Sequence, residues 1–229
     1  MNAATKVIPV IAIDGPSASG KGTIAQAVAN KLGFHYLDSG SLYRLVALAA
    51  VKEATRLDDE TALSRRARHL EVSFDAGEIF LFGQKVTDAI RTEECGVGAS
   101  RVAALPAVRA ALLERQRAFR SPPGLVAEGR DMGTVVFPDA TLKVFLTASA
   151  EIRAERRYKQ LKEKGIDANI RTLLQELRER DERDSARSVA PLQKALDARE
   201  LDSSGLGIEE IARQVLDWYR QKVAGSQHQ

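Results

Sequence analysis

The chain has 229 residues, of which 44% are hydrophobic, 28% charged and 5% aromatic. This length suits one large domain or a domain with a sizeable insert, and the apolar fraction excludes a generally disordered chain. The longest apolar runs, 7–13 and 45–51, have seven residues each, against about 20 for a membrane-spanning helix. We expect no membrane anchor, and no signal peptide, because no small-residue cleavage site follows the first run.

Charge and cysteine content narrow the range of partners. The net charge of +3 suits an anionic ligand, but acidic and basic residues are interleaved without a basic tail, so we expect no nucleic-acid partner. The single cysteine, Cys95, cannot form an internal disulfide, which favours a reducing, cytoplasmic location. We interpret Cys95 as a small core residue. With only three scattered histidines, we expect no zinc site.

The first elements alternate between strand and helix. The sequence predicts a strand at 7–14, a helix at 20–32, a strand at 34–37 and a helix at 41–54. The first strand is a continuous apolar run that ends at Gly15, as in a buried parallel strand. Gly33 closes the first helix, and Asp38 or Ser39 caps the second.

The middle of the chain changes character. Short apolar stretches at 70–74, 79–82 and 84–86 are separated by turn signals at 75–77 and Gly83. They predict a small antiparallel element inserted into a parallel α/β chain. A helix over 107–120 follows, ended by the prolines and glycine at 122–124.

The last part returns to alternation. The predicted elements are strands at 125–128, 142–147 and 198–201 and helices at 150–164, 169–187 and 208–223. In the last helix one apolar face carries Ile208, Ile211, Val215 and Trp218. The whole pattern predicts an α/β fold with a doubly wound, five-stranded parallel sheet.

A glycine-rich loop follows the first strand and opens a helix, as a phosphate-binding loop requires. Its backbone N–H groups and the helix N-terminus attract phosphate, and Lys21 can reach the β- and γ-phosphates. Gly22 stands where the general motif has serine or threonine, so Thr23 is the candidate magnesium ligand, directly or through water. The alternative is a glycine-rich turn that caps a helix. The residues expected to bind a nucleoside triphosphate are Gly15, Pro16, Ser17, Ala18, Ser19, Gly20, Lys21, Gly22 and Thr23.

Two more candidate segments follow other strands, at the edge where open parallel sheets bind ligands. After the second strand, Ser39 lies at a helix N-terminus and Arg44 just over one turn later, where it could clamp a second phosphate group. Equally, Ser39 could be a cap and Arg44 a solvated side chain. After the third core strand, Arg130 and Asp131 lie in a glycine-flanked loop, for which the alternative is a surface turn with a local ion pair.

Two helices carry charged faces. Arg180, Asp184 and Arg187, at i, i+4 and i+7, share one face of the 169–187 helix. The face with Arg153, Arg156 and Arg157 could close over a triphosphate, which would be its anionic target. Solvated helical faces would give the same periodicity.

Four motifs together resemble the bacterial cytidylate kinases of the nucleoside monophosphate kinase group. They are Ile13–Ser17 with Gly20–Thr23, Leu37–Gly40 with Tyr43 and Arg44, Gly129–Asp139, and the Arg/Asp positions of 180–187. The resemblance covers 7–223, and the Gly22-Thr23 pair also matches this group. It implies a kinase core at 1–56, 104–150 and 169–229, a monophosphate-binding insert at 57–103, and a helical lid at 151–168.

The resemblance also implies an activity: transfer of the γ-phosphate of ATP, with Mg²⁺, to CMP or dCMP. The roles it implies are as follows: Ser100, Arg109 and Asp131 read cytosine; Arg44, Arg130 and Arg187 hold the acceptor phosphate; Arg180 and Asp184 contact the ribose; Ser39 adds to the CMP site; Arg153, Arg156 and Arg157 close over ATP; and Lys21, Arg130 and Arg187 are catalytic. Small molecules would be the only partners of a monomeric chain.

Two other functions compete. A kinase of similar fold could act on a hydroxyl group, but a hydroxyl acceptor needs a base and fewer arginines. A nucleotide switch or nucleic-acid-stimulated ATPase is the other alternative. The chain has no Asn-Lys-x-Asp guanine-reading motif and no basic tail.

Overall fold

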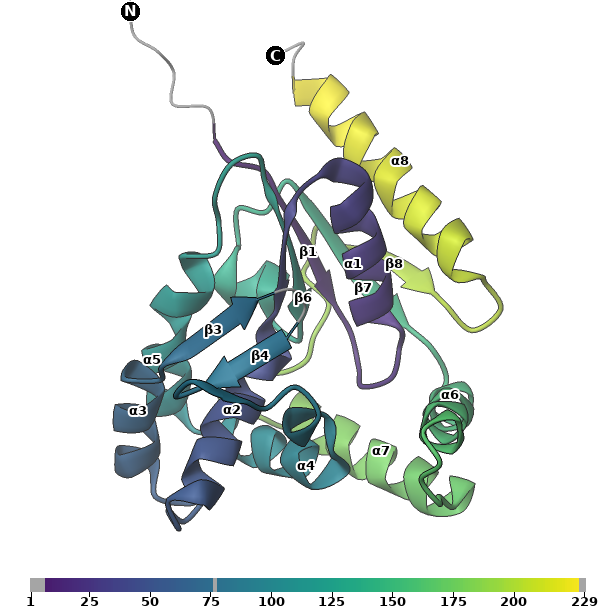
Figure 1. Ribbon diagram of the computed structural model, residues 1–229. Helices are drawn as coiled ribbons and strands as arrows, with labels where there is room; N and C mark the ends of the chain where they lie inside the picture. Colours follow the sequence, from purple (N-terminus) through teal and green to yellow (C-terminus); the bar gives the residue numbers. More distant parts are fainter. Residues whose placement is uncertain (1–6, 76–77, 227–229) are drawn as a thin grey trace, which may run out of the picture. The chain divides into compact units, whose positions relative to one another are not determined.

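The computed structural model describes residues 7–75 and 78–226 (Figure 1). These residues form two compact units. The first unit contains residues 7–37, 117–186 and 190–226, and the second contains 38–116 and 187–189. Among the described residues no single helix is long and apolar enough to span a membrane, and two helices bent by 102° meet that test only when joined.

The first unit is built on a five-stranded parallel sheet with strand order β2-β6-β1-β7-β8. The strands are β1 (Val10–Asp14), β2 (His35–Asp38), β6 (Leu125–Gly129), β7 (Leu142–Thr147) and β8 (Arg199–Asp202). Strand β1 is buried along its whole length, as its continuous apolar sequence predicts for a central strand. The predicted α/β fold with five parallel strands is confirmed.

Two helices from opposite ends of the chain cover one part of this sheet. Helices α1 (Lys21–Leu32) and α8 (Ile208–Ser226) lie side by side (Figure 1) and share one apolar core with β1, β6, β7 and β8. Ile211 and Val215 of α8 are buried there, as predicted. Ile208 is not in this core. It is 52% exposed, because the first turn of α8 borders an open pocket.

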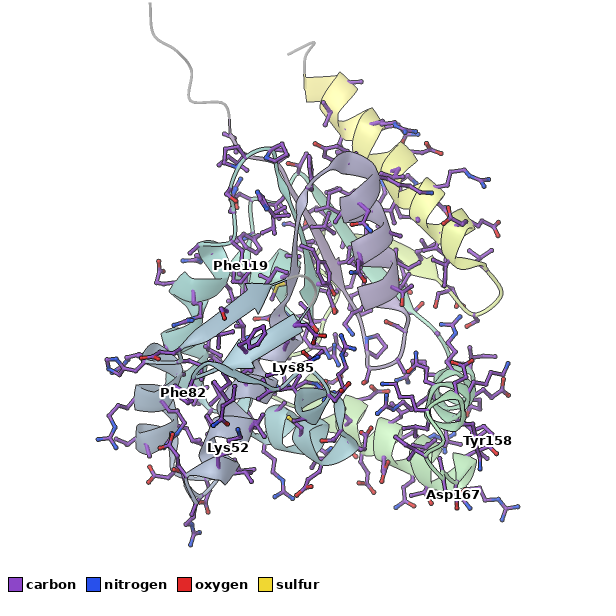
Figure 2. The ribbon with its side chains drawn as sticks, viewed as in Figure 1. Lys52, Phe82, Lys85, Phe119, Tyr158 and Asp167 are labelled. Carbon is purple, nitrogen blue, oxygen red and sulfur yellow. The ribbon has the colours of Figure 1, made fainter. Side chains whose placement is uncertain are left out.

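Helices α6 (Ala150–Glu163) and α7 (Ile170–Ser185) pack against each other in the same unit. At their junction Lys162 lies over the Tyr158 ring, at 5.7 Å, and forms an ion pair with Asp167. Tyr158 and Asp167 are labelled in Figure 2. Helix α7 ends at Ser185, so the prediction that it reaches residue 187 is wrong. The chain turns back there, with the Leu192 N–H donating to the Asp184 carbonyl. Arg187 therefore lies beyond the helix, not on one face with Arg180 and Asp184.

The second unit contains the predicted antiparallel element. Its elements are α2 (Ser39–Lys52), α3 (Glu60–Arg68), β3 (Val72–Asp75), β4 (Glu78–Leu81), β5 (Gln84–Lys85), the short helix η1 (Ala89–Arg91), α4 (Glu93–Val102) and α5 (Pro106–Arg117, whose last residue counts with the first unit). Strands β3, β4 and β5 form one antiparallel sheet. The predicted turn at 75–77 falls partly on residues 76–77, outside the described residues.

Two helices of this unit, α3 and α4, were not predicted. Helix α3 is short and charged, so its apolar periodicity is weak. Helix α4 contains two glycines, which disfavour helix in isolation, but Thr92 caps its first turn by accepting from the Cys95 N–H. Gly98 lets α4 approach α2 closely, because a Cβ there would lie 3.3 Å from the Ala47 Cβ. Cys95 is buried, as predicted for a small core residue.

Candidate active site

The phosphate loop joins β1 to α1 in a conformation that needs glycine. Gly20, with φ of 91°, caps α1 in a left-handed conformation that costs glycine little. At Gly15 a Cβ would lie 2.2 Å from the Leu146 carbonyl oxygen, so no side chain fits. The loop therefore reaches the N-terminus of α1 with its backbone close to the ends of β1 and β7. This is the arrangement expected of an anion-binding loop.

Lys21 is held over the loop by an acidic partner that sequence reasoning missed. Its Nζ donates to the Pro16 carbonyl at 3.2 Å and lies 3.6 Å from Glu128 Oε2. The Tyr36 hydroxyl donates to the other carboxylate oxygen of Glu128 at 3.5 Å. Parallel pairing of β1 with β6 sets Ile13 opposite Glu128, which brings the carboxyl ends of the two strands together. That strand-end position was the available sequence signal for Glu128.

A pocket of about 630 Å³ opens beside this loop. The loop and the start of α1 form one wall, and Arg156, Lys159 and Gln160 of α6 form another. Leu206, Ile208 and Ile211 add an apolar surface. Cationic groups next to apolar ones suit a ligand with a phosphate chain and a flat ring.

The arginines of α6 already have partners within the first unit. Arg153 is 4% exposed, donates to the Ser17 carbonyl at 3.1 Å and forms an ion pair with Asp181. Arg153 thus has an anionic partner in the absence of a triphosphate, and its expected role in closing over a triphosphate stays a prediction. Arg156 donates to the Ser19 carbonyl at 3.2 Å and to Ser203 Oγ at 2.9 Å, and it lines the pocket. Arg157 is half-buried.

The loop after β6 carries a buried ion pair to α7. Arg130 Nε donates to Asp184 Oδ2 at 2.8 Å, and the Asp184 side chain is only 1% exposed. Burial lowers the pKa of Arg130, but the charges of Asp184, Glu128 and Asp181 more than offset it, so its pKa is raised. The pair ties the β6 loop to the end of α7, one turn after Arg180. The alternative of a local ion pair at a surface turn is wrong, because this pair is buried and joins distant segments.

A second carboxylate that sequence reasoning passed over, Asp14, holds the next residues of this loop. Its two oxygens accept from the Met132 and Gly133 N–H groups, both at 2.8 Å. Burial raises the pKa of Asp14 to about 7, while the two N–H groups act in the opposite direction. Asp131, between these residues and Arg130, is buried at 3% exposure.

The remaining predicted residues lie in the second unit. Arg44 Nη1 donates to the Ile90 carbonyl at 2.5 Å and the Thr92 carbonyl at 3.0 Å, so the half-buried Arg44 side chain is held by two backbone carbonyls. Of the two candidate caps of α2, Asp38 is the cap, because it accepts from the Ser41 N–H; Ser39 is the first helical residue and is buried.

The same unit orders Arg109 with an aromatic ring. Arg109 is buried, donates to the Ala103 carbonyl at 3.2 Å, and lies 5.6 Å from the centre of the Tyr43 ring. Ser100, on α4, is buried as well. The predicted acceptor residues are thus divided: Arg130, Asp131, Arg180 and Asp184 belong to the first unit, and Ser39, Arg44, Ser100, Arg109 and Arg187 to the second.

The phosphate loop fits magnesium of the kind that nucleotides bring with them. Among residues 7–75 and 78–226 no three His, Cys, Asp or Glu side chains form a metal-binding group. Mg²⁺ at nucleotides needs only one or two protein oxygens, since phosphates and water supply the rest. Gly22 leaves space that Glu128 uses: a Cβ there would lie 3.1 Å from Glu128 Oε1. Thr23 is exposed beside it and lines the pocket.

The family model and the similar proteins of known sequence agree with each other. The family model described as cytidylate kinase matches residues 11–221. The chain is 60% identical over 217 residues to a cytidylate kinase of Stutzerimonas stutzeri, covering 92% of this chain and 95% of that protein. It is 59% identical over 220 residues to one of Bordetella bronchiseptica, covering 96% and 99%. Among solved structures, a gluconokinase from Sinorhizobium meliloti aligns over 94% of this chain and 93% of its own, with a TM-score of 0.48 and 18% identity.

Proposed function

Since the chain belongs to the cytidylate kinase family, we propose that it transfers the γ-phosphate of ATP to CMP or dCMP, giving ADP and CDP or dCDP. The observation that carries this proposal is the parallel register of β1 and β6, which sets Asp14 opposite Gly129. The phosphate loop follows one strand and the Arg130–Asp131 segment follows the other. A donor phosphate chain and an arginine for a second phosphate therefore meet at one sheet edge.

The chemistry requires positioning and charge neutralisation more than a base. An acceptor phosphate oxygen is already anionic at pH 7, so nothing has to remove a proton before it attacks the γ-phosphorus. Lys21 and the loop N–H groups offset charge on the donor. Arginine grips the acceptor because its planar fork binds phosphate bidentately and stays charged. Holding both reactants in a near-attack geometry can supply roughly 7–11 kcal/mol.

The roles that this proposal assigns follow the resemblance. Lys21, Arg130 and Arg187 are catalytic, and Arg44 joins the two arginines on the acceptor phosphate. Ser100, Arg109 and Asp131 read cytosine, Ser39 adds to the CMP site, and Arg180 and Asp184 contact the ribose. The buried pair of Arg130 with Asp184 supports this, because it links a phosphate-binding group to a ribose-binding one.

Magnesium would enter with ATP, held by Thr23 and Glu128 directly or through water. When bound, it neutralises charge on the β- and γ-phosphates. Arg156 would close over the triphosphate together with Arg157. Arg153 would act with them by fixing α6 against the loop through the Ser17 carbonyl.

A coupled assay of ADP formation tests the proposal. Purified chain with ATP and MgCl₂ is given CMP, dCMP, UMP or no acceptor, and the product is identified by ³¹P NMR. We expect ADP and a cytidine diphosphate with CMP and dCMP, and almost no ADP without acceptor. Lys21→Met is the inactive control.

The two competing functions give different outcomes. ADP formed at the same rate without acceptor would indicate an ATPase and refute the proposal. Absence of a new diphosphate with every nucleoside monophosphate, alongside turnover of a hydroxyl acceptor, would indicate a small-molecule kinase. Inactivity of the wild type on dCMP alone would remove Asp184 and Arg180 from the ribose site as assigned, because the 3′-hydroxyl remains in dCMP.

A further inference from the structure

The turn after β6 is capped by a residue from another strand, not by its own N-cap residue. Hydrogen bonds from Val136 to Asp131 and from Phe137 to Met132 form one wide helical turn, Met132–Val136. Such turns occur often at functional sites. Asp131 stands in the N-cap position, where an aspartate normally accepts from the first N–H groups. Its side chain makes no capping hydrogen bond.

Asp14 supplies that cap from the neighbouring strand. Each of its oxygens takes one N–H, at 2.8 Å. Gly133 also lies close to the Lys143 side chain, because a Cβ on it would lie 3.1 Å from Cδ of Lys143, whereas its distance of 3.5 Å from Asp14 Oδ2 would be an ordinary contact. Lys143 is in turn fixed by Asp197, with its Nζ 2.9 Å from the carboxylate. The start of the turn is thus held by hydrogen bonds to Asp14 and by packing against Lys143.

This arrangement is costly for stability. Asp14 is 5% exposed, and its burial disfavours the charged form. The Asp131 charge disfavours that form further, while Arg130 and the two N–H groups favour it. An apolar residue at the end of β1 would avoid this cost, and Asp131 could then cap its own turn. Proteins tolerate a destabilising feature such as this buried carboxylate mainly where it serves function.

We infer that Asp14 is a positioning residue for base discrimination: it takes over the cap of the Met132–Val136 turn so that the Asp131 carboxylate is directed to the cytosine ring instead. This rests on the proposed function, in which Asp131 reads the base. A carboxylate accepts from the cytosine amine and repels the uracil oxygen. Asp14 therefore sets the preference for CMP over UMP without touching either nucleotide.

Two variants test the inference. Asp14→Asn keeps the size but offers one oxygen and one NH₂ group, so one of the two N–H groups faces a donor. Gly133→Ala keeps Asp14 but places a Cβ 3.1 Å from Lys143 Cδ, so that either the start of the turn or the Lys143 side chain must shift. Val215→Ala, in the core face of α8, is the control that lowers stability without touching this turn. Measurements are kcat/KM for CMP and UMP, affinity for a non-hydrolysable ATP analogue, melting temperature, and hydrogen exchange over 130–137.

For both test variants we expect kcat/KM for CMP to fall about 10–100-fold, since small misplacements in a site have effects of this size. The kcat/KM for UMP should fall by a smaller factor. The CMP/UMP ratio shrinks, exchange over 130–137 becomes faster, and affinity for the ATP analogue stays the same. Val215→Ala lowers the melting temperature and leaves the ratio unchanged.

Three results would overturn the inference. Unchanged exchange over 130–137 in Asp14→Asn would mean that Asp14 does not hold the turn. Equal losses on CMP and UMP, with a lower melting temperature, would leave Asp14 only a structural role while the proposed function stands. A wild type that makes no CDP would overturn the proposed function, and the inference with it.

Discussion

Breaking the buried pair of Arg130 and Asp184 should damage stability and acceptor binding together. In Asp184→Ala the Arg130 guanidinium loses the carboxylate 2.8 Å from its Nε, in a place where the partner side chains are 13% and 1% exposed. Removing one member of a buried ion pair typically costs about 3–5 kcal/mol, because a charge is left uncompensated away from water. For a chain of this size that corresponds to a melting temperature lower by roughly 6–20 °C.

Urea unfolding of four proteins measures this: wild type, Asp184→Ala, Arg130→Met and the double variant. We expect each single change to be severe and the double change to cost less than their sum by about 0.5–3 kcal/mol, since it leaves no unpaired charge of this pair. Calorimetry should show weaker CMP binding in both single variants and unchanged binding of an ATP analogue. Additive single losses, or a loss below about 1 kcal/mol for Asp184→Ala, would refute the reasoning.

Four further outcomes are expected. Lys21→Met should still fold, with a lower melting temperature because Glu128 loses Lys21 as a partner, and lose about 2.7–4 kcal/mol of transition-state stabilisation; activity within a few-fold of wild type would remove Lys21 from the mechanism. Asp131→Ala should lower kcat/KM for CMP far more than for UMP, because mismatched polar groups can reject an analogue by ~10⁴-fold or more; a constant ratio would exclude base reading. The pKa of Asp14 is raised from 3.8 to about 7 in the folded state. Its contribution to the free energy of unfolding is therefore fully present below pH 3.8, the unfolded-state pKa, and is lost as the pH rises through about 7. Between pH 5.5 and pH 8, the free energy of unfolding of wild type, measured in urea, should therefore fall relative to that of Asp14→Asn. The same difference between the two proteins at both pH values would contradict the raised pKa. A bisubstrate analogue should slow hydrogen exchange over 157–165 more than over 150–154, because Arg153 is already tied to Asp181; equal slowing would contradict that distinction.

Local patterns in the sequence were enough to predict the elements of the parallel sheet. Strand β7 has the predicted limits, and α1 ends at Gly33, whose φ of 64° explains the glycine. Where local signals were weak or misleading, the predictions failed. The glycines of α4 concealed a helix that packs closely on α2. The charge periodicity of 169–187 continued past the point where α7 actually ends.

The sequence by itself determined the phosphate loop, the strand–helix order and the residue types proposed for the acceptor site, because each is encoded by neighbours along the chain. Which groups pair was decided only by the tertiary structure. Glu128 meets Lys21, and Asp14 caps the turn after Asp131, because parallel pairing of β1 with β6 aligns segments more than 100 residues apart. Arg153 was predicted to meet a triphosphate, yet packing of α6 on α7 gives it Asp181. Burial makes such pairings strong, and no local pattern records which distant charge will share a buried site.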